Sequence, residues 1–276
     1  MSTRWSERLA VCSWSLRPET PQKLIEDLKA IGIDNVQIAL DPFRTRPQVW
    51  QKFLELVAQN GIRMISGMLA TVGEDYTTME SIRRTGGIVP DETWDQNWKN
   101  IQEIAAIASK LGISLVTFHA GFLPHDPSDP GFAKLLKRLR DVADVFAAKN
   151  ISLGLETGQE TAQALGEFLT KLQRPNVGVN FDPANMILYE QGDPIEALRA
   201  LAPWLRQVHI KDGNRTRMPG RWGDEGVVGT GEVDWKAFFK VLSDVNFTGY
   251  CCIEREAGNQ RLNDIKAAKQ FIDTKI

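Results

Sequence analysis

Four side chains able to hold a metal ion stand at matching positions in the last four apolar segments of the sequence. They are Glu156 in ISLGLET, Asp182 in VGVNFDP, His209 in RQVHIKD and Glu254 in YCCIERE. Each lies at the C-terminal end of a short apolar run, just before a loop. Unpaired acids at the ends of buried strands are costly unless a cation or another partner neutralises them. If the four segments are neighbouring parallel strands, we expect three carboxylates and one imidazole to converge.

This ligand set favours Mn²⁺, Mg²⁺ or Co²⁺, with Zn²⁺ as a further candidate, because it offers three oxygens, one nitrogen and no thiolate. Four protein ligands leave room on the ion for two adjacent oxygens of a hydroxy-ketone. The ion would polarise the carbonyl and stabilise a metal-bound enediolate. Glu156 and Glu254 would remove and return a proton, a form of catalysis in which each positioned group contributes about 10²–10⁴-fold.

Each of these residues also has a structural interpretation when it is taken singly. His209 in an apolar strand is typical of a core histidine, and Glu254 beside Arg255 is typical of an ion pair. Their joint placement favours the functional interpretation. His119, which ends VTFHA, is expected to line the pocket and bond a substrate hydroxyl, with a loop cap as the alternative. His125 is expected to be a solvated loop residue.

Strands and helices alternate from one end of the chain to the other. Amphipathic helical segments separate the strands, and three of them close with Gly32, Gly61 and Gly112, where a left-handed residue ends a helix. Thr20 before Pro21 predicts an N-cap and a first-turn proline. The predicted strands cover 9–14, 35–40, 62–69, 114–120, 152–157, 177–182, 206–211 and 249–256.

Eight apolar strands alternating with helices predict a closed (β/α)₈ TIM barrel rather than an open sheet. The turn CSWSLRPET after the first strand lacks the glycine pattern of a dinucleotide fold. With no evident linker, we expect one domain over residues 1–276. Two long connections, 71–92 and 212–233, follow the third and seventh strands, at the end of the barrel where such enzymes place their sites.

Composition excludes several classes of function. The 276 residues are 42% hydrophobic and 25% charged, with a formal net charge of −2. This charge gives no attraction to nucleic acid or to an anionic membrane. No segment reaches the roughly 20 apolar residues of a membrane span, and the N-terminal segment lacks a signal-peptide core. The sequence predicts buried, reduced thiols at Cys12, Cys251 and Cys252. We therefore expect a cytoplasmic protein.

The motifs LGLET, VNFDPAN, VHIKD, GTGEVDW and IERE, in this order, resemble those of the xylose isomerase-like TIM barrels, in the branch of sugar phosphate isomerases and epimerases. The resemblance covers nearly the whole chain. It implies that Glu156, Asp182, His209 and Glu254 hold one divalent ion, often Mn²⁺, and that the two glutamates double as the acid–base pair. Related barrels form dimers or tetramers, which makes a homo-oligomer an expectation.

The resemblance also implies roles for residues around this set. Lys211 in the HIKD segment approaches the substrate, and Gly229 and Gly231 shape the following loop. Trp14, at the end of the first strand, corresponds to a region where an aromatic ring packs on the sugar. Ketose 3-epimerases carry a histidine three residues after the strand-6 aspartate, whereas this chain has Asn185, which can bond a substrate hydroxyl but does not titrate.

The sequence therefore favours an isomerase or epimerase that acts on a small ketose or keto-sugar by proton transfer. The alternative is a lyase or dehydratase that uses the same enediolate and expels a leaving group. An apurinic endonuclease is less favoured, because a trinuclear zinc site needs more imidazoles than three histidines supply. A silent sugar-binding barrel is disfavoured because both glutamates are present. Arg215, Arg217 and Arg221 are candidates to bind a phosphate, but they do not establish a phosphorylated substrate.

Overall fold

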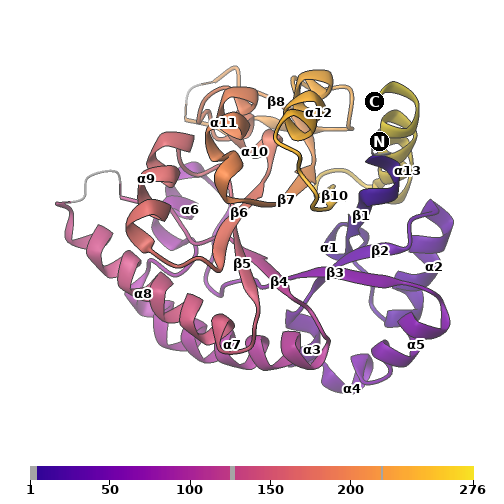
Figure 1. The fold of residues 1–276 in the computed structure, drawn as a ribbon, viewed down its shortest axis with the longest axis horizontal. Helices are drawn as coiled ribbons and strands as arrows, with labels where there is room; N and C mark the ends of the chain where they lie inside the picture. The colour runs from indigo at the N-terminus through magenta and orange to yellow at the C-terminus, as the bar shows by residue number, and fades with distance from the viewer. Residues whose placement is uncertain (1–4, 125–127, 219) are drawn as a thin grey trace.

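The computed structural model describes residues 5–124, 128–218 and 220–276, so His125 lies outside the described residues. Eight parallel strands close into a barrel in the order β1-β10-β7-β6-β5-β4-β3-β2 (Figure 1). Every predicted strand is present, so the predicted (β/α)₈ barrel is confirmed. The strands are β1 (Leu9–Cys12), β2 (Asn35–Ala39), β3 (Arg63–Met68), β4 (Leu115–Phe118), β5 (Ser152–Glu156), β6 (Val177–Phe181), β7 (Leu205–Ile210) and β10 (Cys251–Ile253).

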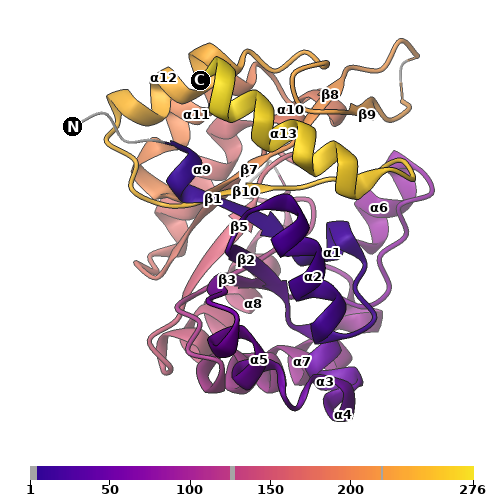
Figure 2. The same cartoon turned by 90° about the vertical axis from the view of Figure 1, so that its right-hand side faces the viewer.

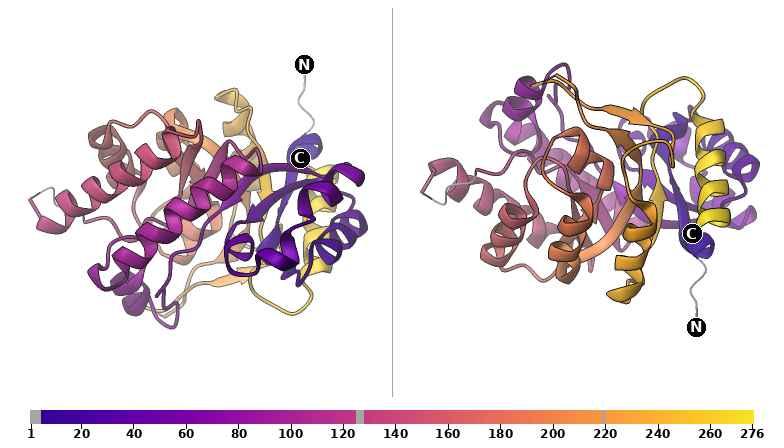
Figure 3. Two further views of the ribbon diagram at one scale, coloured as in Figure 1. Left: turned by 90° about the horizontal axis from the view of Figure 1, so that it is seen from below. Right: turned by 90° about the horizontal axis from the view of Figure 1, so that it is seen from above.

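Helices surround the barrel and cover the outer faces of its strands (Figures 2 and 3). The longer ones are α2 (Pro21–Ile31), α7 (Asp91–Lys110), α8 (Pro130–Ala147), α9 (Ala162–Leu172), α12 (Trp235–Asp244) and α13 (Arg261–Lys275). Shorter ones are η1 (Trp5–Arg8), α1 (Ser13–Leu16), α3 (Asp41–Thr45), α4 (Pro47–Trp50), α5 (Phe53–Gln59), α6 (Met79–Thr85), α10 (Pro183–Leu188), α11 (Pro194–Leu201) and η2 (Ala202–Trp204). Within the described residues, no helix combines the length and apolarity that a membrane crossing requires.

Local signals in the sequence account for the ends of several helices. The Thr20 hydroxyl accepts a hydrogen bond from the Lys23 N–H, and Pro21 opens α2. Gly32 adopts φ +76° at the end of α2, where a residue with a Cβ would be strained. Gly61 and Gly112 also have positive φ, so the three predicted glycine stops are confirmed. The three cysteines are buried and free, as predicted.

The structure differs from the sequence-based expectation at three places. The first strand ends at Cys12, and Trp14 lies in the one-turn helix α1, where the Ser13 hydroxyl accepts a hydrogen bond from the Ala39 N–H. The 71–92 connection contains α6, capped by Thr78. The 212–233 connection contains an antiparallel hairpin of β8 (Asp212–Asn214) and β9 (Asp224–Gly226). No apolar periodicity announces a hairpin this short.

The Asp212 carboxylate organises the hairpin and the GTGEVDW turn. It is fully buried and accepts five hydrogen bonds. The donors are the backbone N–H groups of Gly213, Gly229, Gly231 and Val233 and the indole N–H of Trp235. Five donors at fixed positions hold this carboxylate in one orientation. The turn is therefore wound around one buried carboxylate, which places the hairpin at the C-terminal end of the barrel.

Inside the barrel, polar side chains replace part of the apolar filling that such barrels usually have. The Ser66 hydroxyl donates to Gln207 Oε1 at 2.6 Å, and Gln207 Nε2 donates to Asn180 Oδ1 at 3.1 Å. Gln37 Nε2 donates to Thr117 Oγ1 at 2.7 Å. All five residues are buried. Buried polar groups need hydrogen-bond partners, and here each group finds its partner on another strand. The pairing therefore depends on the register of the strands.

The Gly231→Ala substitution tests the role of the Asp212 turn. The added Cβ would lie 2.2 Å from Asp212 Oδ1 and 2.6 Å from the Gly213 nitrogen. We expect the free energy of unfolding to fall by about 2–3 kcal/mol in urea titrations followed by circular dichroism. Gly226→Ala is the matched control in the hairpin, because its Cβ meets only Thr230 Oγ1, at 3.3 Å. Equal losses in both variants would contradict this role.

Candidate functional site

Glu156, Asp182, His209 and Glu254 come together at the C-terminal end of the barrel. Glu156 is the last residue of β5, Asp182 follows β6 as the N-cap of α10, His209 lies near the end of β7, and Glu254 follows β10. These four strands are consecutive neighbours in the ring. Parallel strands end at the same edge, so the alternating chain delivers the four side chains to one place.

The three carboxylates surround one imidazole nitrogen. Glu156 Oε1, Asp182 Oδ2 and Glu254 Oε2 each lie 3.5 Å from His209 Nδ1. The four ligand atoms all lie within 4.8 Å of one another, and Asp182 and His209 are 0% exposed. Neither Asp182 Oδ2 nor His209 Nδ1 has a hydrogen-bond partner among the described residues. Unpaired buried atoms facing one point fit a shared cation.

The charges around this point also fit a divalent ion. Three carboxylates and the ammonium of Lys211, which is buried beside them, leave a net charge of −2 when the histidine is neutral. Burial lowers the pKa of His209, but the nearby Glu254 and Glu156 charges prevail and hold it well above its usual range. The buried carboxylates therefore attract positive charge to the position that His209 Nδ1 faces.

Gln37 and Thr117 orient the imidazole from the other side. His209 Nε2 lies 3.0 Å from Gln37 Oε1, and the Gln37 amide nitrogen is held by Thr117. Asn180 Nδ2 lies at the same distance from Nε2. In the tautomer that carries its proton on Nε2, Gln37 Oε1 accepts that proton and the Nδ1 lone pair is directed at the carboxylates. Sequence reasoning missed Gln37. Its signal was a polar residue in the middle of the apolar segment NVQIA.

Both oxygens of Glu254 are fixed by hydrogen bonds. The Trp14 indole N–H donates to Oε1 at 2.6 Å, and the Lys211 ammonium donates to Oε2 at 2.9 Å. Lys211 also donates to Glu256 Oε2 at 2.8 Å, and the Glu256 side chain is half exposed. Burial raises the pKa of Glu254, but the charges of Lys211 and His209 outweigh it and hold the pKa well below its usual range. Trp14 therefore contacts the four converging residues through its indole N–H group, which is bonded to Glu254.

Asn185 and His119 lie against Glu156. Asn185 Nδ2 donates to Glu156 Oε1 at 3.1 Å and to the Thr157 carbonyl, and its backbone N–H donates to Asp182 Oδ1. His119, just after β4, places Nε2 at 3.6 Å from Glu156 Oε1, while its Nδ1 is buried without a hydrogen-bond partner among the described residues. His119 thus turns Nε2 toward Glu156, and its other ring nitrogen is the one that lacks a partner.

A further buried acid, Glu160, lies in the loop that follows β5. Its Oε1 accepts a hydrogen bond from the Leu123 N–H, and burial raises the pKa of the carboxyl to about 7. That hydrogen bond and the charge of His119 lower the pKa, but by less than burial raises it. The sequence analysis did not single out Glu160. It lies in a polar loop four residues beyond Glu156, where a glutamate is expected to be exposed to solvent. Only the packing of the two loops buries it.

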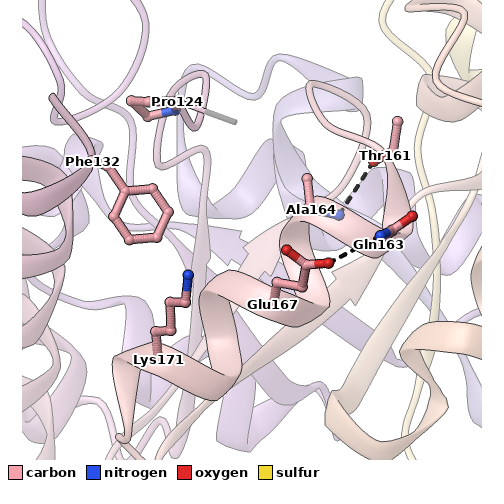
Figure 4. Close-up of a pocket in the computed structure, with 7 residues that line it drawn as sticks. All are labelled: Pro124, Phe132, Thr161, Gln163, Ala164, Glu167 and Lys171. Atoms are coloured by element: carbon pink, nitrogen blue, oxygen red, sulfur yellow. Dashed lines mark hydrogen bonds between the residues drawn. The ribbon is translucent and has the colours of Figure 1, made fainter. Parts of the chain in front are cut away.

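A separate hollow of about 250 Å³ lies between α8 and α9 (Figure 4). Phe132, Glu167 and Lys171 are among its lining residues, and none of the four converging side chains contributes to it. Its exposed lining carries no unsatisfied buried atom among the described residues. The four predicted ligand residues therefore lie outside this hollow.

The chain is similar to several known proteins. A crystal structure of a xylose isomerase domain protein from Planctomyces limnophilus is 34% identical, covers 90% of each chain and superposes with a TM-score of 0.84. A ketose 3-epimerase from Arthrobacter globiformis is 34% identical over 106 residues, 36% of this chain and 32% of its own. An inosose dehydratase from Clostridium botulinum is 25% identical over 134 residues, 43% of this chain and 45% of its own.

The matched segments span between 32% and 50% of the lengths of these curated relatives and of a further one. The solved structure, in contrast, is matched along most of its length. The family model described as xylose isomerase-like TIM barrel matches residues 25–275. On this coverage, together with the closed eight-stranded barrel, the chain belongs to the xylose isomerase-like TIM barrel family.

Proposed function

We propose that the protein is a divalent-metal-dependent isomerase or epimerase that moves a proton on a small ketose or keto-sugar. The observation that carries the proposal is the meeting of three buried carboxylate oxygens at 3.5 Å around His209 Nδ1, with Asp182 Oδ2 and Nδ1 itself unpaired among the described residues. The matched relatives include a ketose 3-epimerase and an inosose dehydratase, whose names both refer to small carbohydrates or polyols, and this supports the class.

Glu156, Asp182, His209 and Glu254 would hold the ion. The donor set of three oxygens and one nitrogen favours Mn²⁺ and also suits Mg²⁺, Co²⁺ or Zn²⁺. When bound, the ion supplies Lewis-acid polarisation of a substrate carbonyl. A structural neighbour of this chain, a xylose isomerase-like barrel from Mycobacterium smegmatis, was crystallised in complex with magnesium. At 16% identity that neighbour shares the fold alone, and the donor atoms of this chain are what support a metal site.

Glu156 and Glu254 are the proton-transfer groups in this proposal. They extend from β5 and β10, which are separated in the ring by β6 and β7, so they approach the site from different directions. Asn185 orients Glu156, and Trp14 with Lys211 orients Glu254. One glutamate removes the proton beside the carbonyl and the other returns a proton to the resulting enediolate. In this proposal, the His119 side chain and the Lys211 ammonium bond substrate oxygens.

The second candidate is a dehydratase on a keto-polyol. Removal of the same proton, followed by departure of a β-hydroxyl as water, leads to an enone instead of an epimer. The match to the inosose dehydratase favours this candidate, in which the second glutamate would protonate the departing hydroxyl. An apurinic endonuclease has less support, because His209 is the only histidine in the cluster of candidate ligands among the described residues. The single domain, the homo-oligomer and the cytoplasmic location stay predictions.

Replacing either glutamate tests the proton transfer. We expect Glu156→Gln and Glu254→Gln each to lower turnover by at least about 10³-fold on a panel of ketoses and keto-sugars with Mn²⁺, because each removes a proton-transfer group. Solvent deuterium uptake reports epimerisation and ultraviolet absorbance reports an enone. Glu167→Gln, in the hollow between α8 and α9, is the control and should keep normal turnover. Near-normal activity of either site variant would rule out the two-glutamate scheme.

Metal removal tests the cation site without requiring a known substrate. We expect saturating Mn²⁺ to raise the melting temperature of the chelator-treated protein by roughly 5 °C or more, because binding stabilises only the folded state. Asp182→Asn should abolish most of this shift, since it removes one carboxylate from the cluster. Differential scanning calorimetry provides the measurement. An unchanged melting temperature in the wild-type protein would count against a metal site.

Gln37→Leu tests the support of His209. We expect a loss of about 10–100-fold in Mn²⁺ affinity by isothermal titration calorimetry, because the Nε2 proton would lose its acceptor. Asn35→Leu is the matched control on the same strand, since Asn35 donates to the Leu9 carbonyl and makes no contact with the imidazole. If both variants bind Mn²⁺ equally well, Gln37 does not set the orientation of the ring.

A further inference from the structure

The thiol of Cys12 lies beside the ring nitrogen of His209 that does not face the carboxylates. Cys12 is the last residue of β1, and it is fully buried. Its Sγ lies 3.8 Å from His209 Nε2 and 3.4 Å from Gln37 Oε1, to which the thiol donates. The proposed function gives a role to Nδ1 of the same ring and none to this thiol.

Cys12, His209 and Glu254 form a second group of buried side chains with the spacing of metal ligands. The Cys12 sulfur, a ring nitrogen of His209 and a carboxylate oxygen of Glu254 all lie within 4.8 Å of one another. Their strands β1, β10 and β7 are consecutive in the ring. The thiol therefore arrives at this place only because the first strand of the barrel closes against the last one.

The donor atoms of this group differ from those of the four converging residues. One sulfur takes the place of the two carboxylates of Glu156 and Asp182. Mn²⁺ and Mg²⁺ prefer oxygen ligands, whereas a thiolate selects softer ions. Zn²⁺ accepts all three of the ligand types present here, namely thiolate, imidazole and carboxylate. A thiolate and a carboxylate together carry two negative charges, which match a divalent ion when the imidazole is neutral.

Trp14 holds the thiol and the Glu254 carboxylate close together. Its indole N–H donates to Glu254 Oε1 at 2.6 Å, and its ring packs against the buried cluster that contains Cys12. The other oxygen of Glu254, Oε2, lies 3.5 Å from His209 Nδ1. Glu254 therefore stands between the two groups, and a single ion passes from one group to the other without leaving its carboxylate.

We propose that Cys12, His209 and Glu254 form a binding site for thiophilic divalent ions such as Cd²⁺ and Zn²⁺, and that an ion in this site excludes a hard ion from the four converging residues. On binding, the S–H bond of Cys12 breaks, a sulfur–metal bond forms, and the proton passes to solvent. The two groups exclude each other because both contain His209 and Glu254.

A thiophilic ion in this site would act on the protein as an inhibitor. It occupies Glu254, one of the two proposed proton-transfer groups, and it leaves Glu156 and Asp182 without their shared ion. Hard ions do not produce this state, because their weak bonds to sulfur do not offset the loss of the thiol proton. The inference concerns metal binding alone and goes beyond the proposed function, so it can be tested without a substrate.

Titration of the metal-free protein with Cd²⁺ tests the proposal. A bond between a thiolate and Cd²⁺ gives a charge-transfer absorption band in the ultraviolet, which oxygen and nitrogen ligands do not give. We expect the band to saturate at about one equivalent of Cd²⁺ and to be absent with Mn²⁺. Saturation with Cd²⁺ should also abolish the heat of Mn²⁺ binding in isothermal titration calorimetry, since the two ions share ligands.

Two substitutions of Cys12 assign the sulfur. Cys12→Ser and Cys12→Ala should each abolish the band and lower Cd²⁺ affinity by at least about 100-fold, because the loss of a directly bound ligand costs no less than the loss of a residue that orients one. Mn²⁺ affinity should change by less than about threefold, which also reports that the variants are folded. Cys251→Ala is the matched control, because Cys251 is equally buried but belongs to neither group of candidate ligands among the described residues.

A Cd²⁺ complex without the band, a band that persists in both Cys12 variants, or simultaneous binding of Cd²⁺ and Mn²⁺ would overturn the proposal. Failure of the proposed function gives a different result. If Mn²⁺ does not bind, or if the Glu156 and Glu254 variants keep normal turnover, a Cd²⁺ band that depends on Cys12 still establishes the thiophilic site.

Discussion

Three carboxylates buried around one imidazole nitrogen are the arrangement on which the rest of the structure depends. Like charges whose oxygens lie within 4.8 Å of one another in a protein interior repel strongly, and burial alone would drive the groups to neutrality. The surrounding chain opposes this with hydrogen bonds from Asn185 and Trp14 and with the Lys211 ammonium. Negative charge remains uncompensated at one point, and the proposed cation would neutralise it.

The barrel concentrates these groups because its strands all end at one edge. Below the four converging residues, the interior holds Gln37, Thr117, Asn180 and Gln207 in place of an apolar layer. Each of these polar groups is paired, so the network is rigid as well as tolerable in the interior. Above the four residues, loops from opposite sides of the ring meet through aromatic contacts. The site therefore lies between the polar interior of the barrel and loops that are joined by aromatic contacts.

Much of the fold could be predicted because its signals are local. Apolar runs of strand length, glycines such as Gly32 after helices, and the Thr20–Pro21 cap each depend on a few adjacent residues. The hairpin of β8 and β9 could not be predicted, because its strands are three residues long and are held by the distant donors that surround Asp212. The sequence prediction placed Trp14 one element too early for a similar reason, since the Ser13–Ala39 hydrogen bond that accompanies the turn joins α1 to β2.

The sequence by itself determined which residues stand at the ends of strands, and hence that Glu156, Asp182, His209 and Glu254 would share an edge. Strand periodicity and parallel topology are enough for that, because every strand of such a barrel delivers its last residue to the same side. Only the tertiary structure decided that Gln37 faces the imidazole, that Glu160 is buried and that Tyr76 meets Trp222. These outcomes depend on register between strands and on the packing of loops far apart in the chain, which no local pattern encodes.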